Sequence, residues 1–394
     1  MRASRLLPFL AALPFALPGC GPAPEPPETE ATAPAETQPA ARWSVDEATA
    51  WYAEQPWPVG TNFGPSTAIN QLEMWQAESF DIETIEKELA LSASIGMNTH
   101  RVFLHDLLWD QDPEGFADRI DQFLAAADSH GIKPMLVLFD GVWDPRPELG
   151  PQREPVPHKH NSGWVQSPGA EALKDESQYP RLKEYVQGVI GRFADDERVL
   201  AWDLFNEPEN RNADAYGDVE LPDKYDRAFA LLRNAFAWAR EVDPSQPLTA
   251  GVWGDFIGSD GLQPDKLSSI SKFMLESSDI ITFHTYETPD VAPRQIEYLQ
   301  TYDRPILCTE YVARSRDNTF ETLLPLFKEH KVGAYNWGFV SGKTNTIYPW
   351  DSWEKEYTAE PELWHHDIFR PDHTPYRQAE VDLIRSLTSG EGDE

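Results

Sequence analysis

Two glutamates stand in sequence settings that suit paired carboxyl chemistry. Glu207 follows an apolar run within Trp202-Asp203-Leu204-Phe205-Asn206-Glu207-Pro208, and Glu310 ends a second apolar run that begins at Pro305. Cleavage of a glycosidic bond requires two such carboxyl groups on either side of the reacting carbon. One must donate a proton to the leaving oxygen, while the other must stay ionised to attack or stabilise the cationic sugar.

Polar and aromatic side chains end most of the other apolar runs of the chain. They are Arg101, His105, Asp140, Trp253, His284, Tyr286 and Trp337. A guanidinium beside a carboxylate keeps that carboxylate charged, so Arg101 is a candidate partner of Glu310. Asn206, next to Glu207, is able to hydrogen-bond a sugar hydroxyl near the reacting carbon. So many polar and aromatic ends indicate a binding site for a sugar.

Apolar, β-rich runs alternate with amphipathic helical patterns through most of the chain. The runs span residues 58–63, 99–105, 134–140, 200–206, 248–253, 280–286, 305–310 and 334–339. Each is separated from the next by enough residues for a crossover helix, which favours parallel strands. We therefore predict a single-domain (β/α)₈ barrel, with the reactive groups at the C-terminal ends of the strands. A doubly wound sheet is the competitor, but residues 60–64 do not match its glycine-rich phosphate turn.

The helical segments carry their own start and stop signals. Asp81 is placed to cap a helix whose apolar face begins at Ile82, and Gly96 ends it. A second helix is predicted to end before Gly131, and two more over residues 223–242 and 319–330. The connection over residues 141–199 is unusually long and rich in proline, so we expect a lid or wall beside the site.

The ordered strand ends resemble those of the clan A glycoside hydrolases, particularly the cellulase and mannanase family, family 5. The matching residues are Arg101, Asn206-Glu207-Pro208, His284-Thr285-Tyr286, Thr309-Glu310-Tyr311 and Trp337. The resemblance implies retention of configuration, with Glu207 as acid/base and Glu310 as nucleophile. It also implies that His284 and Tyr286 orient the carboxylates, that Trp337 is an aromatic floor, and that no cofactor takes part. Where relatives often carry a histidine, this chain has Asp140.

Several interpretations of the site remain open at this point. An endo-β-glycanase of cellulase, mannanase or xylanase type is favoured, and an exo-β-glycosidase with a pocket closed by residues 141–199 is the alternative. A non-catalytic carbohydrate-binding lipoprotein has no need of a paired acid and nucleophile. A metal-dependent hydrolase is the remaining rival, although residues 158–160 and 365–366 lack an obvious ligand set. Further tryptophans that could stack on sugars are Trp109, Trp143, Trp253, Trp350 and Trp353.

The ends of the chain indicate export. Residues 1–20 resemble a bacterial lipoprotein signal with Cys20 as the lipidated residue, and residues 21–42 read as a disordered tether. The folded domain then spans 43–388, with a polar tail at 389–394. We expect a cell-envelope protein anchored in the outer membrane through this lipid, or otherwise secreted. The net charge of −33 argues against nucleic acid as a partner, and the oligomeric state stays open.

Cys308 lies inside an apolar run, unlike Cys20, which lies next to the tether. We therefore expect a small buried core residue at Cys308 and no disulfide between the two.

Overall fold

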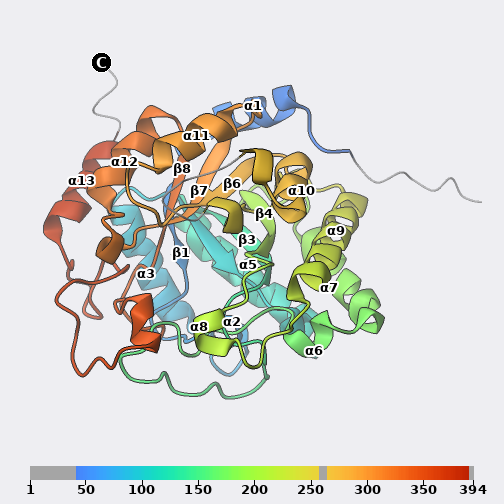
Figure 1. Cartoon of the computed structure of the whole chain (residues 1–394), viewed down its shortest axis with the longest axis horizontal. Coiled ribbons are helices and arrows are strands. Elements are labelled where there is room, and N and C mark those ends of the chain that lie inside the picture. The colour runs from blue at the N-terminus through green and yellow to red at the C-terminus, as the bar shows by residue number, and fades with distance from the viewer. Residues whose placement is uncertain (1–40, 257–263, 390–394) are drawn as a thin grey trace, which may run out of the picture. The chain divides into compact units, whose positions relative to one another are not determined.

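The computed structural model describes residues 41–256 and 264–389 (Figure 1). The lipoprotein signal, most of the tether and all but the first residue of the polar tail lie outside these ranges, so they stay predictions. Within the described residues, no helix is both long enough and apolar enough to cross a bilayer.

Eight parallel strands form one sheet in the order β5-β4-β3-β2-β1-β8-β7-β6. The first strand, β1, pairs with β2 on one side and with the last strand, β8, on the other. The remaining gap between β5 and β6 is bridged by a parallel pairing of Val252 with Phe283, so the barrel is nearly closed. Single-domain (β/α)₈ architecture is therefore confirmed. The strands are β1 Val59–Phe63, β2 Thr99–Phe103, β3 Lys133–Asp140, β4 Ala201–Asn206, β5 Leu248–Thr249, β6 Ile281–His284, β7 Ile306–Tyr311 and β8 Gly333–Trp337.

The predicted strands agree with the observed ones within a few residues, except that β5 is much shorter than the predicted run 248–253. Between Thr249 and Phe256, the chain bonds to β6 only through the main chain of Val252, whose N–H donates to the Thr282 carbonyl at 3.0 Å. Cys308 is a buried free thiol on β7, as predicted.

The helices of the described residues lie around the barrel and, in one case, at its mouth. They are α1 Val45–Ala53, α2 Gln71–Trp75, α3 Ile82–Ser94, α4 Asp106–Gln111, α5 Pro113–Ser129, α6 Ala170–Leu173, α7 Tyr179–Arg192, α8 Ala213–Tyr216, α9 Lys224–Val242, α10 Ser269–Ser277, α11 Ala292–Gln300, α12 Phe320–Glu329 and α13 Gln378–Thr388. Asp81 caps α3 by accepting from the Thr84 N–H, and Gly96 follows the helix with φ of +84°. These local signals explain why the predicted helix positions are right.

Two long loops rise from the C-terminal ends of β3 and β8. The first, residues 141–169, is followed by α6 and α7, so only half of the predicted connection 141–199 is irregular. The second, residues 338–377, contains the short 3₁₀ helix η5 (Trp350–Trp353). Figure 1 shows the green loop after β3 running toward the red loop after β8. These two loops stand over the mouth of the barrel.

Gly60 on β1 tests how closely neighbouring strands pack. A Cβ added there would lie 1.8 Å from the carbonyl oxygen of Thr99, whereas one added at Gly64 meets nothing within 4 Å. We expect Gly60→Ala to lower the free energy of unfolding by about 1–3 kcal/mol, since β1 and β2 would have to move apart. Gly64→Ala, the matched control, should change it by less than about 0.5 kcal/mol. Equal urea midpoints for both variants would contradict this packing.

Candidate active site

A cavity of about 350 Å³ opens at the C-terminal ends of the strands. Its walls bring together six of the residues singled out from the sequence: Asn206, Glu207, His284, Tyr286, Glu310 and Trp337. They come from β4, β6, β7 and β8 and from the residues just after these strands. Arg101 lies directly behind the cavity, where it contacts Glu310.

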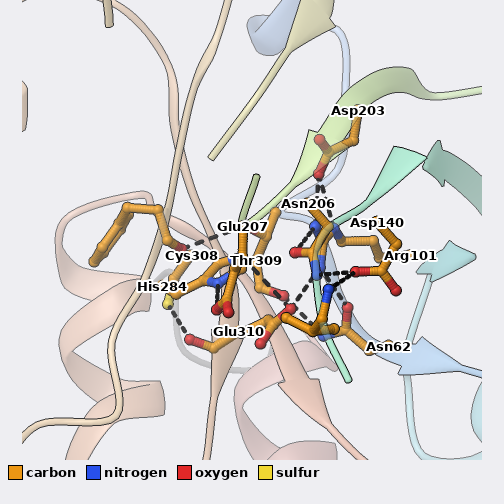
Figure 2. A network of polar contacts seen from close by, with 12 residues as sticks. Asn62, Arg101, Asp140, Asp203, Asn206, Glu207, His284, Cys308, Thr309 and Glu310 are labelled. Atoms are coloured by element: carbon orange, nitrogen blue, oxygen red, sulfur yellow. Dashed lines mark hydrogen bonds and ion pairs between the residues drawn. The ribbon is translucent and has the colours of Figure 1, made fainter. Parts of the chain in front are cut away.

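Arg101 is fully buried and bonds to four side chains at once (Figure 2). Its Nη1 donates to Glu310 at 2.8 Å and to Asn62 at 2.9 Å. Its Nε donates to Asp203 at 2.9 Å, and its Nη2 donates to Asn206 at 2.7 Å. Burial alone would lower the pKa of Arg101, but the two carboxylates raise it above its ordinary value. The guanidinium is therefore a permanent charge that ties β1, β2, β4 and β7 together.

Glu310 is 5% exposed and is held by donors on both carboxylate oxygens. Arg101 donates to Oε1, while the Tyr286 hydroxyl donates to Oε2 at 2.8 Å. Burial raises the pKa of Glu310, and the Arg101 charge and the Tyr286 hydrogen bond oppose that rise. A carboxyl in direct contact with a guanidinium and a phenol is suited to carry negative charge.

Glu207 is equally buried, at 5% exposure, but no cation touches it. Its carboxyl bonds to His284 Nδ1 at 2.7 Å and accepts from the Asn210 amide at 2.7 Å. Burial raises the pKa of Glu207 to about 8. Its pKa thus lies above neutral pH although the Asn210 hydrogen bond opposes the rise. The carboxyl therefore holds its proton at neutral pH.

His284 stands between the two glutamates. Its Nδ1 meets Glu207, and its Nε2 is 3.6 Å from Glu310 (Figure 2). Burial lowers the pKa of His284 to about 4, so the ring is neutral at pH 7. A neutral imidazole with one donor and one acceptor nitrogen fixes the orientation of Glu207 without adding charge to the site.

Asp140 occupies the third-strand position at which relatives often carry a histidine. It does not line the cavity but accepts hydrogen bonds from Asn206 at 2.9 Å and from the Trp164 indole at 2.6 Å. The Asn206 oxygen accepts from Arg101, and one amide hydrogen of Asn206 is donated to Asp140. The second amide hydrogen is therefore left for a ligand. Asp140 is thus a positioning residue behind the cavity wall.

Aromatic rings form much of the remaining wall. Trp337 packs edge-on against Phe103 and Trp164, with ring centroids 5.7 and 5.8 Å apart. Of the further tryptophans, those that line the cavity are Trp143, Trp253, Trp350 and Trp353. Trp109 does not line it, because its ring lies against Gly188 of α7. His105 is also outside the cavity, since it caps α4 by accepting from the Leu107 N–H.

Among the residues that the structure describes, the groups that could hold a metal are Glu207, His284 and Glu310, whose ligand atoms lie within 4.8 Å of one another. The Arg101 guanidinium already supplies positive charge 2.8 Å from Glu310 and would repel a divalent ion. His160 and His366, raised above as metal candidates, both line the cavity. Each directs Nδ1 at a main-chain carbonyl, Tyr348 for His160 and Val312 for His366.

Residues 58–343 match the family model described as cellulase (glycosyl hydrolase family 5). The chain belongs to glycosyl hydrolase family 5. The predicted resemblance is therefore confirmed, and the match begins just before β1 and ends just after β8.

Proteins with assigned names resemble this chain in sequence or in fold. A probable mannan endo-1,4-β-mannosidase F from Emericella nidulans is 24% identical over 174 residues, which cover 43% of this chain and 36% of that protein. An exo-β-1,4-mannosidase from Opitutaceae bacterium strain TAV5 is 20% identical with a TM-score of 0.57, over 84% of this chain and 60% of that one. The endo-β-1,4-mannanase of Thermotoga petrophila is 16% identical with a TM-score of 0.55, over 87% of this chain and 79% of that one. The chain thus spans about a third of the first relative, and the structural likenesses show the fold.

Three residues of this family 5 site were missed from the sequence: Asn62, Asp203 and Asn210. Asn62 and Asp203 interrupt apolar strands with a polar side chain, a signal of a buried partner. That partner, Arg101, lies 39 and 102 residues away. Asn210 follows Glu207 in a turn and carries no distinguishing pattern.

Arg101→Lys tests whether the four hydrogen bonds of Arg101, and not its charge alone, stabilise the barrel. Lysine has no planar fork and is unable to serve four partners at once, so buried acceptors would be left unpaired. We expect a loss of about 3 kcal/mol or more in the free energy of unfolding, measured by urea denaturation. Arg146→Lys, at an ion pair whose arginine side chain is 56% exposed, is the matched control and should cost less than about 0.5 kcal/mol. A small and equal loss of stability in both variants would contradict this role of the Arg101 hydrogen bonds.

Proposed function

We propose that this chain is a retaining glycoside hydrolase that cleaves β-1,4-linked glycans of the mannan type without a cofactor. The observation that carries the proposal is the pair of buried glutamates with opposite surroundings. Glu310 is held by a guanidinium, whereas Glu207 has neutral partners and a pKa of about 8. Acid/base and nucleophile roles follow from this contrast.

The spacing of the two carboxyls supports retention. One carboxylate oxygen of Glu207 and one of Glu310 lie within 4.8 Å of each other. Retaining enzymes hold their carboxyls roughly 5–5.5 Å apart, while inverting enzymes leave about 6.5–9.5 Å for a water molecule. The oxygen separation is closer to the retaining range, which favours direct attack of Glu310 on the anomeric carbon.

In the proposed first step, Glu310 attacks the anomeric carbon as Glu207 gives its proton to the leaving oxygen. The C–O bond to the leaving sugar breaks, and a glycosyl ester on Glu310 forms. Glu207, now ionised, then takes a proton from water, whose oxygen displaces Glu310 from the sugar. The free amide hydrogen of Asn206 faces the reacting sugar, and Trp337 offers an apolar face beneath it.

The substrate class rests on the relatives. The names of the Emericella nidulans relative and of the two structural neighbours all refer to β-1,4-mannosidase or mannanase activity. We therefore propose a β-1,4-linked mannoside as the first substrate to try, with xylo- and cello-oligosaccharides beside it. The names include both endo and exo attack, so they leave the position of cleavage open.

Glu310→Ala tests the nucleophile. With a β-mannoside that carries an activated aryl leaving group, we expect kcat to fall by at least about 10⁴-fold, since no covalent intermediate can form. Added azide would occupy the vacated space, restore turnover and yield the α-glycosyl azide, which NMR identifies. Glu287→Ala, at another buried cavity glutamate, should gain nothing from azide. Wild type without hydrolytic activity on any glycoside would instead favour a carbohydrate-binding protein.

The pH profile of kcat/KM tests the acid. Glu207 must be protonated to act, so activity should fall as the pH rises through its pKa of about 8. The Asn210 amide stabilises the ionised carboxylate, and Asn210→Ala should therefore raise this pKa. We expect the basic limb to move up by roughly 0.4–1 pH unit, the effect of one hydrogen bond of about 0.5–1.5 kcal/mol. A limb that stays in place or moves down would exclude Glu207 as the group that titrates.

A further inference from the structure

Three loops are joined over the β1–β2 side of the barrel mouth. Lys343 N–H, in the loop after β8, donates to the Ser66 carbonyl at 3.0 Å, in the loop after β1. Asn161 N–H, in the loop after β3, donates to the Thr344 carbonyl at 2.8 Å. The amide of Asn70, in the loop after β1, donates to the Gly163 carbonyl at 2.8 Å. Each loop is thus bonded to both of the others.

Side chains strengthen the contact between the two longer loops. The Trp353 indole donates to the His160 carbonyl at 2.9 Å, and the Ser352 hydroxyl accepts from the His160 N–H at 3.1 Å. The rings of Trp143 and Trp353 stack 5.7 Å apart at 15°. Loops held by stacked rings and buried hydrogen bonds form a fixed wall.

Little space remains behind this wall. Beyond Trp337, toward β1, two cavities of about 30 and 10 Å³ lie among Phe63, Phe103 and Trp164. Such volumes hold about one or two water molecules, not a sugar ring. The exposed residues that line the main cavity are Ala213, Asp214 and Arg316, in the loops after β4 and β7. The main cavity is therefore closed toward β1, and its exposed lining residues lie in the loops after β4 and β7.

The direction of closure matters because the two glutamates define the two sides of the scissile bond. The acid Glu207 must lie beside the leaving sugar, so the rest of the substrate extends away from it. Glu207 follows β4, and β8 and β1 lie on the opposite side of the barrel. The closed side is thus the one toward which the non-reducing end of the substrate would extend.

We infer that the cavity accepts only the terminal sugar on the non-reducing side of the cleaved bond, so that the chain is an exo-acting hydrolase. The inference rests on the proposed function and specifies its mode of attack. Hydrogen-bonding groups at the loop junction give the closed end its recognition chemistry. Asn161 is buried, lines the cavity, and has no partner for its Oδ1 among the described residues.

His160 and His366 complete the closed end. Their rings lie 5.2 Å apart, and His366 lies 5.8 Å from Tyr286, the residue that donates to Glu310. With Nδ1 bound to a carbonyl, each neutral ring offers Nε2 as an acceptor toward the cavity. Three acceptors at one end suit the free hydroxyls of a terminal sugar, and an additional glycosidic linkage there would leave them unpaired.

A matched pair of substrates tests the inference on the full chain. One is β-1,4-mannopentaose labelled at its reducing end with a fluorescent amine, and the other is the same compound capped with a 4,6-O-benzylidene acetal at its non-reducing end. We expect free mannose and a labelled tetrasaccharide as the first products from the uncapped compound. The capped compound should react at least about 100-fold more slowly, because its terminal sugar does not fit.

Early release of internal fragments, or equal rates on both compounds, would overturn exo action while leaving the proposed function intact. No cleavage of either compound or of an aryl β-mannoside would instead count against the proposed function.

His160→Ala tests the closed end with mono-deoxy aryl β-mannosides. Wild type should lose about ten- to a hundredfold in kcat/KM on the analogue that lacks the hydroxyl bound by His160, and the variant should lose nothing further on that analogue. His158→Ala, which removes a loop contact to Tyr348 but no cavity-lining group, should stay within about twofold of wild type on all analogues. If His160→Ala instead lowers kcat/KM by the same further factor on every deoxy analogue, this contact between His160 and a sugar hydroxyl is excluded.

Discussion

The buried guanidinium of Arg101 is the constraint on which the rest of the site depends. It is fully buried on β2, and its partners come from β1, β4 and β7. A charge so far from water is tolerable only when its hydrogen bonds are complete, so each partner must stay in place. The same bonds fix the carboxylate of Glu310 and the amide of Asn206. Folding of the barrel and assembly of the reactive groups are therefore one requirement.

Two glutamates with equal burial acquire different chemistry from their neighbours. Glu310 receives a charged donor and a phenol, which favour its ionised form. Glu207 receives a neutral imidazole and an amide, and burial then dominates its pKa. His284 contacts Glu207 and approaches Glu310, so its neutral ring holds the two side chains close to each other. In the proposed mechanism, environment and not residue type therefore separates the acid Glu207 from the nucleophile Glu310.

The strands and the two glutamates could be predicted because apolar runs and their polar ends are local patterns. Asn62 and Asp203 could not be assigned to Arg101, since the contacts join strands that are distant in sequence. Asp140 stands where relatives often carry a histidine, yet it lies behind the cavity wall and supports Asn206. The loop after β3 was expected as a wall, but its bonds to the loops after β1 and β8 depend on long-range geometry. Local sequence patterns therefore predicted the catalytic candidates better than the residues that hold them in place.

In the proposed mechanism the anomeric carbon is inverted twice, once by Glu310 and once by water, so that its configuration is retained. The anomeric form of the first-released sugar reports this directly. We would follow hydrolysis of a β-mannoside by wild-type enzyme with ¹H NMR, before mutarotation mixes the anomers. The account predicts that β-mannose appears first and the α-anomer grows in later. Initial release of α-mannose would contradict it, because Glu310 would then activate water instead of bonding to the sugar.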